Sequence, residues 1–228
     1  MAVIHRTTME PTKLQLLTPW LPTRPWYTGP AGGAELSPAG GFRLDDPEGE
    51  VGIELMVVTD TSGERPVPYL VPLTYRGAPL EGAGEALVGT TEHGVLGRRW
   101  VYDGAHDPVL AAQLLALFVG RAQPQAQSLT DTPDPTVAVH SAGAGHPAAI
   151  TSSTVRDGKH GTDIVLRTAS EAGQEASAVI AVTRVLRADE PAARTGGSKA
   201  RGHVTAGWRL PDGGAARGPF FTLSDERP

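Results

Sequence analysis

Short apolar runs separated by turn-forming residues dominate the first half of the chain and predict an antiparallel sheet. The cluster at 45–49 and the segment 60–64 carry the Asp, Gly and Ser residues typical of turns. Residues 28–41 are rich in Gly and Pro and are expected to form a loop. The strands predicted here are 3–8, 41–46, 51–59, 68–75 and 94–102.

Two helices are expected among these strands. Leucines recur at helical spacing at Leu14, Leu17 and Leu21. Pro11 suits the start of this helix, and Pro19 and Pro22 limit it to about two turns.

The second helix is expected over 109–118, with Asp107 as N-cap and Pro108 in its first turn. Gly120 and Arg121 suit its C-terminal end. Its residues are apolar on nearly every side, so it should be buried on most faces.

The polar, proline-containing segment 122–135 is expected to cross the surface as a linker. Hairpin turns are expected at 156–159 and 211–214, and a charged loop at 187–201. The strands predicted after the linker are 136–141, 153–156, 163–168, 177–186, 202–209 and 220–223.

Pro68 and Pro72 lie two residues apart in one predicted strand, so both missing N–H donors face the same side. This spacing predicts that the strand lies at a sheet edge. The alternative is that its hydrogen bonds fall on the other residues.

Composition narrows the class of protein. Gly (28) and Pro (20) favour turns and short strands over long helices. The net charge of −5 argues against nucleic-acid binding, and no apolar run is long enough for a membrane span. The absence of cysteine excludes disulfides and thiol nucleophiles. A cytoplasmic location is expected, because the N-terminus lacks an apolar signal segment.

The segment from Trp20 to Gly29, with the sequence WLPTRPWYTG, resembles the opening of the N-terminal cap domain of actinobacterial maltokinases. It differs at Pro25, where that segment has Arg. The resemblance covers about residues 1–125. It implies a cystatin-like cap, with a helix packed on an antiparallel sheet, and therefore a β-rich α+β fold.

The resemblance also divides the chain. It implies a cap-like domain at 1–125, a linker at 126–135 and a small antiparallel unit at 136–228. Residues 1–135 carry 16 acidic and 9 basic residues, and residues 136–228 carry 9 acidic and 11 basic residues. The resulting net charges of −7 and +2 should attract the two parts weakly. We expect the second unit to pack on the cap face that a kinase would otherwise cover. Self-association or a protein partner at that face is the alternative.

Kinase chemistry is not expected, since no phosphate-cradling loop and no catalytic loop with metal-binding carboxylates is found. Relatives of this kind are sometimes named 1,4-alpha-glucan branching proteins, but the chain is too short for that barrel enzyme. The seven histidines form no metal-binding spacing, so neither a metal nor a cofactor is predicted. The resemblance implies a non-catalytic interaction or regulatory protein linked to glycogen and trehalose metabolism.

A carbohydrate or small-ligand module is the second hypothesis, with an α-glucan as ligand, and an unrecognised enzyme is the third. Aromatic side chains stack on sugars and arginines bind anionic groups. Packing of the aromatics against the sheet and surface ion pairing of the arginines are the alternatives. The candidate ligand-binding residues are Trp20, Arg24, Trp26, Tyr27, Arg98, Arg99 and Trp100.

Overall fold

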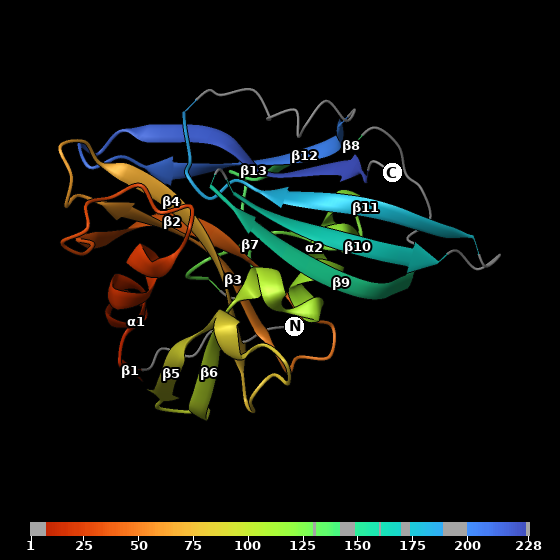
Figure 1. Ribbon diagram of the computed structural model, residues 1–228, viewed down its shortest axis with the longest axis horizontal. Coiled ribbons are helices and arrows are strands. Elements are labelled where there is room, and N and C mark those ends of the chain that lie inside the picture. Colours follow the sequence, from red (N-terminus) through yellow and green to blue (C-terminus); the bar gives the residue numbers. More distant parts are fainter. Residues whose placement is uncertain are drawn as a thin grey trace.

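Two antiparallel sheets and two α-helices form the computed structural model, which describes residues 8–129, 131–141, 149–159, 161–169, 174–188 and 200–226. In Figure 1 the first sheet, in orange to yellow-green, lies below and to the left of the second sheet, in teal and blue. The described residues are β-rich with few helices, as expected for a β-rich α+β class.

The first sheet has seven strands, all within residues 9–126. Its central strands are long and its two end strands have two residues each. In spatial order the strands are β1 (Met9–Glu10), β5 (Leu87–His93), β6 (Gly97–Asp103), β4 (Val67–Arg76), β3 (Gly52–Asp60), β2 (Leu36–Leu44) and β7 (Gln125–Ala126).

The second sheet has six strands, all from the second half of the chain. In spatial order they are β8 (Ala138–Ser141), β12 (Ala200–Arg209), β13 (Ala215–Asp225), β11 (Glu175–Val182), β10 (Gly161–Ala169) and β9 (Ala149–Gly158).

Both α-helices begin at side-chain caps. α1 (Lys13–Trp20) follows a capping box in which Thr12 and Gln15 bond each other's backbone. α2 (Pro108–Phe118) begins after Asp107, whose side chain accepts a hydrogen bond from the N–H of Val109, so the predicted N-cap is confirmed. The 3-10 turns are η1 (Leu21–Thr23), η2 (Gly84–Ala86) and η3 (Gly104–His106).

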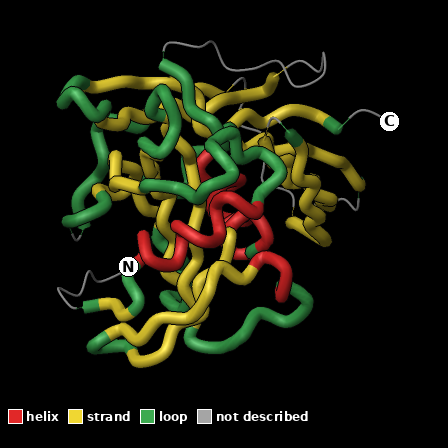
Figure 2. The backbone as a smooth tube through the Cα atoms, turned by 60° about the vertical axis from the view of Figure 1, so that its left-hand side comes forward, coloured by secondary structure: helices red, strands yellow, loops and turns green. Residues whose placement is uncertain are grey.

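The first sheet is covered on both faces. Met56 and Val58 of β3 face α1 in one buried cluster, whereas Leu55 and Val57 face the second sheet and α2 in another. Figure 2 shows the helices, in red, gathered in the middle of the molecule between strands. Burial on both faces explains why β3 is apolar along nearly its whole length rather than alternating.

The two halves of the chain share one hydrophobic core, to which both sheets contribute buried side chains. The rings of Phe42 in β2 and Phe220 in β13 stack with their centroids 6.1 Å apart. β2 is bent by a bulge between Pro38 and Gly40. At the next residue, Gly41, φ is +121°, and a Cβ would lie 2.0 Å from the carbonyl oxygen of Leu55, so only glycine fits there.

The chain also crosses from the second sheet to the first. After β11 the backbone leaves its sheet and runs beside β4, where Leu70 N–H donates to Arg184 O and Leu186 N–H donates to Pro68 O, both at 2.9 Å. Tyr69 and Val185 form the intervening bridge. The predicted strand 177–186 is therefore two pieces, because its last residues pair with the other sheet.

This crossing explains the prolines of β4. The strand lies inside the sheet rather than at its edge, so the edge prediction is wrong. β6 pairs with β4 only from Leu73 onward. The N–H of Leu70 points to the crossing segment, and Pro68 and Pro72 share its orientation, so their missing donors face the side away from β3.

Other expectations need correction. The loop predicted at 28–41 ends early, since β2 begins at Leu36. Residues 87–93 form β5, a strand that was not predicted, and its partner β6 begins at Gly97 rather than at 94. Within the predicted linker, Gln125–Ala126 forms β7 on the edge of β2. β9 continues to Gly158, so its turn falls after the predicted one.

Two predictions lie wholly or largely outside the described residues. The strand expected at 3–8 belongs to the undescribed N-terminal segment apart from residue 8, which is not in a strand. Most of the loop at 187–201 also lies outside them. The turn at 211–214 is confirmed by Leu210 N–H donating to Gly214 O at 2.8 Å.

Candidate functional site

Four of the predicted ligand-binding residues lie together at the C-terminal end of α1 and just after it, and the two tryptophans among them are buried. Trp26 is fully buried and Trp20 is 7% exposed. Their rings meet edge to face with centroids 6.0 Å apart, and Trp26 also contacts Tyr69 at 6.1 Å. Neither tryptophan presents a free ring face to solvent, so both fill the packing role that was the alternative to sugar stacking.

Arg24 and Tyr27 lie at the outer side of this cluster. The guanidinium of Arg24 lies 4.9 Å from the centroid of the Trp20 ring. The Tyr27 hydroxyl donates to Asp60 Oδ2 at 2.8 Å. Burial and then the hydrogen bond to Asp60 raise the pKa of Tyr27 to about 12, so the phenol stays neutral.

Arg184 reaches this cluster from the second half of the chain and was not predicted. It is fully buried, and Nη2 donates to Asp103 Oδ2 at 2.6 Å while Nε donates to Thr162 Oγ1 at 2.7 Å. Its guanidinium lies 4.7 Å from the centroid of the Trp26 ring. Through Asp103, Trp26 and Thr162, this buried arginine connects the end of β6, the segment after α1 and strand β10 of the second sheet.

The remaining predicted residues lie elsewhere, on the β5–β6 hairpin. Arg98 pairs with Glu92 at 2.9 Å, with both side chains exposed, and Arg99 Nη2 donates to Leu96 O at 2.8 Å. Trp100 is half-buried. Its neighbour Val101 faces α1, so strand alternation places Trp100 on the opposite face from the Trp20–Trp26 cluster. The seven predicted residues therefore form two separate groups.

A buried carboxylate anchors the start of α1. Glu54 of β3 accepts hydrogen bonds from Lys13 Nζ at 2.8 Å, Tyr75 Oη at 2.6 Å and Gln127 Nε2 at 2.7 Å. Burial by itself would raise the pKa of Glu54, but the charge of Lys13 and these three hydrogen bonds hold it below its usual value. Every partner stabilises the charged form, which suits a structural ion pair better than a proton donor.

We expect this carboxylate to make the fold sensitive to acid. Because the pKa of Glu54 is lower in the folded chain than its ordinary 4.5, its contribution to stability is complete above that pH and is lost as the pH falls through the folded value. Glu54→Gln should lower the free energy of unfolding by about 2 kcal/mol at pH 7 and flatten its decline between pH 5 and 3. Urea unfolding at several pH values measures both effects.

Glu92→Gln is the matched control, because Glu92 also pairs with a cation but is exposed. It should change stability by less than about 0.5 kcal/mol at any of these pH values. An acid decline equally steep in Glu54→Gln and in the unsubstituted chain would show that Glu54 is not responsible.

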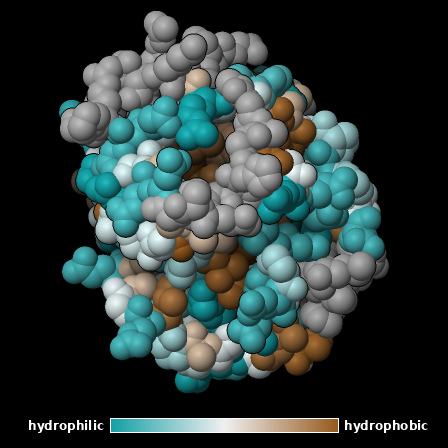
Figure 3. Space-filling model, turned by 90° about the vertical axis from the view of Figure 1, so that its right-hand side faces the viewer, coloured by the Kyte–Doolittle hydropathy of each residue, from teal (hydrophilic) through white to brown (hydrophobic). Residues whose placement is uncertain are grey.

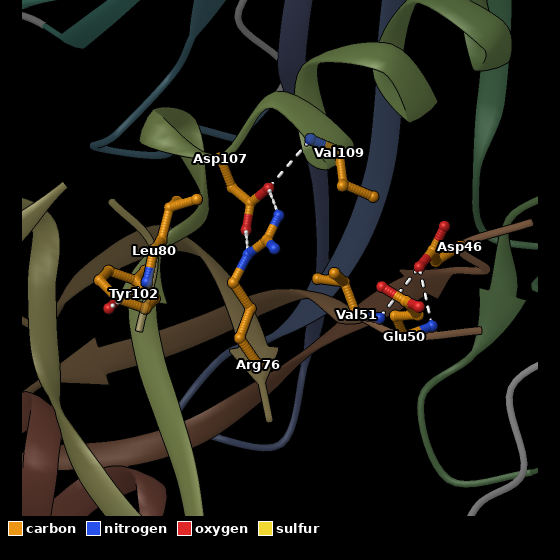
Figure 4. Close-up of polar contacts among 8 residues, drawn as sticks. All are labelled: Asp46, Glu50, Val51, Arg76, Leu80, Tyr102, Asp107 and Val109. Carbon is orange, nitrogen blue, oxygen red and sulfur yellow. Dashed lines mark hydrogen bonds and ion pairs between the residues drawn. The ribbon is translucent and has the colours of Figure 1, made fainter. Parts of the chain in front are cut away.

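A second ion pair fixes the start of α2 (Figure 4). Arg76 donates to both oxygens of Asp107, through Nε at 2.7 Å and Nη2 at 2.6 Å, while Asp107 caps the helix. Nearby, Asp46 accepts the backbone N–H groups of Glu48, Glu50 and Val51. This bonding confirms the turn expected at 45–49 and leaves the Asp46 oxygens engaged by the backbone.

On the described surface, a cavity lies at the C-terminal end of α2. It encloses about 740 Å³ and is lined by the last turn of α2, the following residues to Pro124, and Val139 and Ser141 of β8, with Arg121 as its one charged side chain. On the face drawn in Figure 3, hydrophobic areas are separated by hydrophilic residues. Within the described ranges, no three histidine or acidic side chains lie close enough to hold a metal ion.

Neither described helix has the length and apolar content needed to span a membrane. A search of curated proteins finds no match to the chain. A family model described as the maltokinase N-terminal cap domain matches residues 20–107. The matched segment begins at Trp20, includes Trp26 and Asp103, and ends at the cap of α2. The chain therefore carries a maltokinase N-terminal cap-like domain.

Proposed function

We propose that this chain is a non-catalytic interaction or regulatory protein of α-glucan and trehalose metabolism that acts in the cytoplasm. The proposed link to α-glucan and trehalose metabolism rests on the similarity to the maltokinase cap domain. The observation that carries the non-catalytic part is the use of the buried carboxylates. Those of Glu54, Asp103 and Asp107 are each paired with a cation, and those of Asp46 and Asp60 accept backbone N–H groups.

Carboxylates used in this way are poor acids and bases. A general acid needs a raised pKa and a position beside the substrate, whereas the partners of Glu54 and Asp60 lower the pKa of each. Their surroundings stabilise the fold instead of a reacting group.

The covering of the cap-like domain supports an independent role for the chain. One face of the first sheet packs on α1 and the other packs on the second sheet, in a core shared by both halves. A partner enzyme would then contact the outer surface of the folded chain, not the interior face of its cap. We therefore propose a partner at the outer surface instead of self-association through the cap face, since the second sheet packs on that face.

Mixing the purified chain with a maltokinase, and separately with enzymes that make or degrade glycogen, tests the proposal. We expect no phosphate transfer from ATP to maltose by the chain alone, a complex with at least one enzyme by analytical ultracentrifugation, and a change in that enzyme's kcat/KM. Turnover of maltose or glycogen by the chain alone would contradict the proposal.

An α-glucan-binding module is the second candidate, favoured by the half-buried Trp100 and by Arg98 on the same strand face. Titration with maltose and glycogen, followed by tryptophan fluorescence, distinguishes the two. A saturable change that disappears in Trp100→Ala would favour this candidate over the first.

A further inference from the structure

The end strands of the two sheets differ greatly in length. The first sheet ends in β1 and β7, each of two residues, and the second sheet ends on one side in β8, of four residues. The other end of the second sheet is β9, which has ten residues (Figure 1). Short end strands are a common protection against pairing with another chain, and β9 lacks this protection.

The outer edge of β9 is regular over most of its length. Seven consecutive residues, 152–158, pair one to one with β10, and the single irregularity lies before them near Thr151. Within the described residues, β9 pairs with β10 alone, so the backbone groups on its other side have no strand partner. Unpaired N–H and C=O groups in a row form a template for an added strand.

The side chains of β9 also permit pairing. The strand contains neither proline nor lysine, the residues that usually block an edge. Residues 152–155 are Ser, Ser, Thr and Val, which are uncharged and, for Thr and Val, favoured in strands. The charges come at the end: Arg156 pairs with Glu226 at 3.4 Å, and Asp157 accepts a hydrogen bond from Thr162.

We propose that β9 pairs antiparallel with β9 of a second copy of this chain, joining the two six-stranded sheets across a twofold axis near Thr154. A twofold axis perpendicular to the sheet places residues of the same face opposite each other. With the axis at Thr154, the two threonines lie opposite each other and Ser152 lies opposite Arg156.

This register opposes no two like charges, and cross-strand threonine pairs are favourable. An identical edge on each copy also closes the assembly at two chains, because each edge is then fully paired. A different protein would also need an unpaired strand edge to pair with β9, and no feature of β9 favours one. A second copy of this chain always brings such an edge.

Light scattering during size-exclusion chromatography of the full chain tests the pairing. The expected mass is twice the 23.8 kDa of one chain. Thr154 is exposed, so Thr154→Lys and Thr154→Glu should fold with the same circular dichroism spectrum as the unsubstituted chain. Each should raise the dissociation constant by about tenfold or more, because like charges then face each other across the axis.

Mixing the two variants makes the test specific. Lysine on one copy then lies opposite glutamate on the other, so the mixture should form a heterodimer that neither variant forms alone. Val95→Lys is the control, since Val95 is 60% exposed at the tip of the β5–β6 hairpin and should leave the dimer intact.

Three results would overturn the proposal. The first is an unsubstituted chain that runs as a monomer at all concentrations tested. The second is a dimer that persists in both Thr154 variants. The third is a dimer that dissociates in Val95→Lys.

Discussion

Arg184→Leu is expected to lower the free energy of unfolding by about 3–5 kcal/mol, one of the largest effects of any single substitution in this chain. The substitution leaves the carboxylate of Asp103 buried without its cation, and removes the guanidinium that lies against Trp26. Removing one partner of a fully buried ion pair costs more than the pair contributes, because the remaining charge has lost both water and its counterion. Urea unfolding at neutral pH measures the loss.

Two control variants separate the buried charge from other effects. Arg98→Leu removes an arginine whose ion pair is exposed, and should cost less than about 0.5 kcal/mol. Combining Arg184→Leu with Asp103→Leu removes both charges and should recover part of the stability lost in the single variant. If the free energy of unfolding of Arg184→Leu lies within about 1 kcal/mol of that of the unsubstituted chain, the ion pair is not a major contributor to stability.

Trp26→Ala is expected to cost about 3–5 kcal/mol, since Trp26 is the largest fully buried side chain and its removal leaves a cavity. The loss should exceed that for Trp100→Ala, because Trp100 is only half-buried and belongs to neither buried cluster. Thermal and urea unfolding of both variants give the comparison.

The same pair of variants tests the role of the tryptophans. If Trp26 packs the cap-like domain, its loss should lower stability regardless of any added sugar. A Trp26→Ala chain that keeps its full stability but no longer binds an α-glucan would contradict the packing role.

The sequence was informative where local rules act. Asp107 and Pro108 predict the start of α2 correctly. Helix capping and the preference for proline in the first turn depend only on the backbone within a few residues. The core of β3 was equally predictable from its apolar, β-branched content. The segment from Trp20 identified the cap-like domain, which the family model then matched.

The sequence was uninformative where distant segments meet. Arg184 sits in a stretch without a motif, and Asp103 lies 81 residues away, so no local pattern links them. The predicted strand 177–186 spans the crossing from β11 to β4, because apolar and β-branched residues continue through both pieces. The two prolines of β4 did mark a side without donors, but only the fold shows that the crossing segment lies along it.

The sequence does not show which of the candidate site residues lie together. The aromatic and arginine residues form one predicted group because their side chains suit sugar or anion binding. Residue type does not indicate burial, and Trp26 is buried whereas Arg98 is exposed. Trp100 and Arg98 of β6 also lie on the face of the first sheet opposite the Trp20–Trp26 cluster, which depends on strand pairing.

We expect the cap-like domain and the second sheet to fold as one cooperative unit, because both contribute side chains to one hydrophobic core. Native-state hydrogen exchange of the full chain, resolved by peptide mass spectrometry over low urea concentrations, tests it most directly. If the two parts are one unit, the amides of β3 and β4 and those of β10 and β13 should exchange through a single opening with one free energy and one urea dependence. Exchange of β10 and β13 through a separate opening of much lower free energy, while β3 and β4 stay protected, would contradict it.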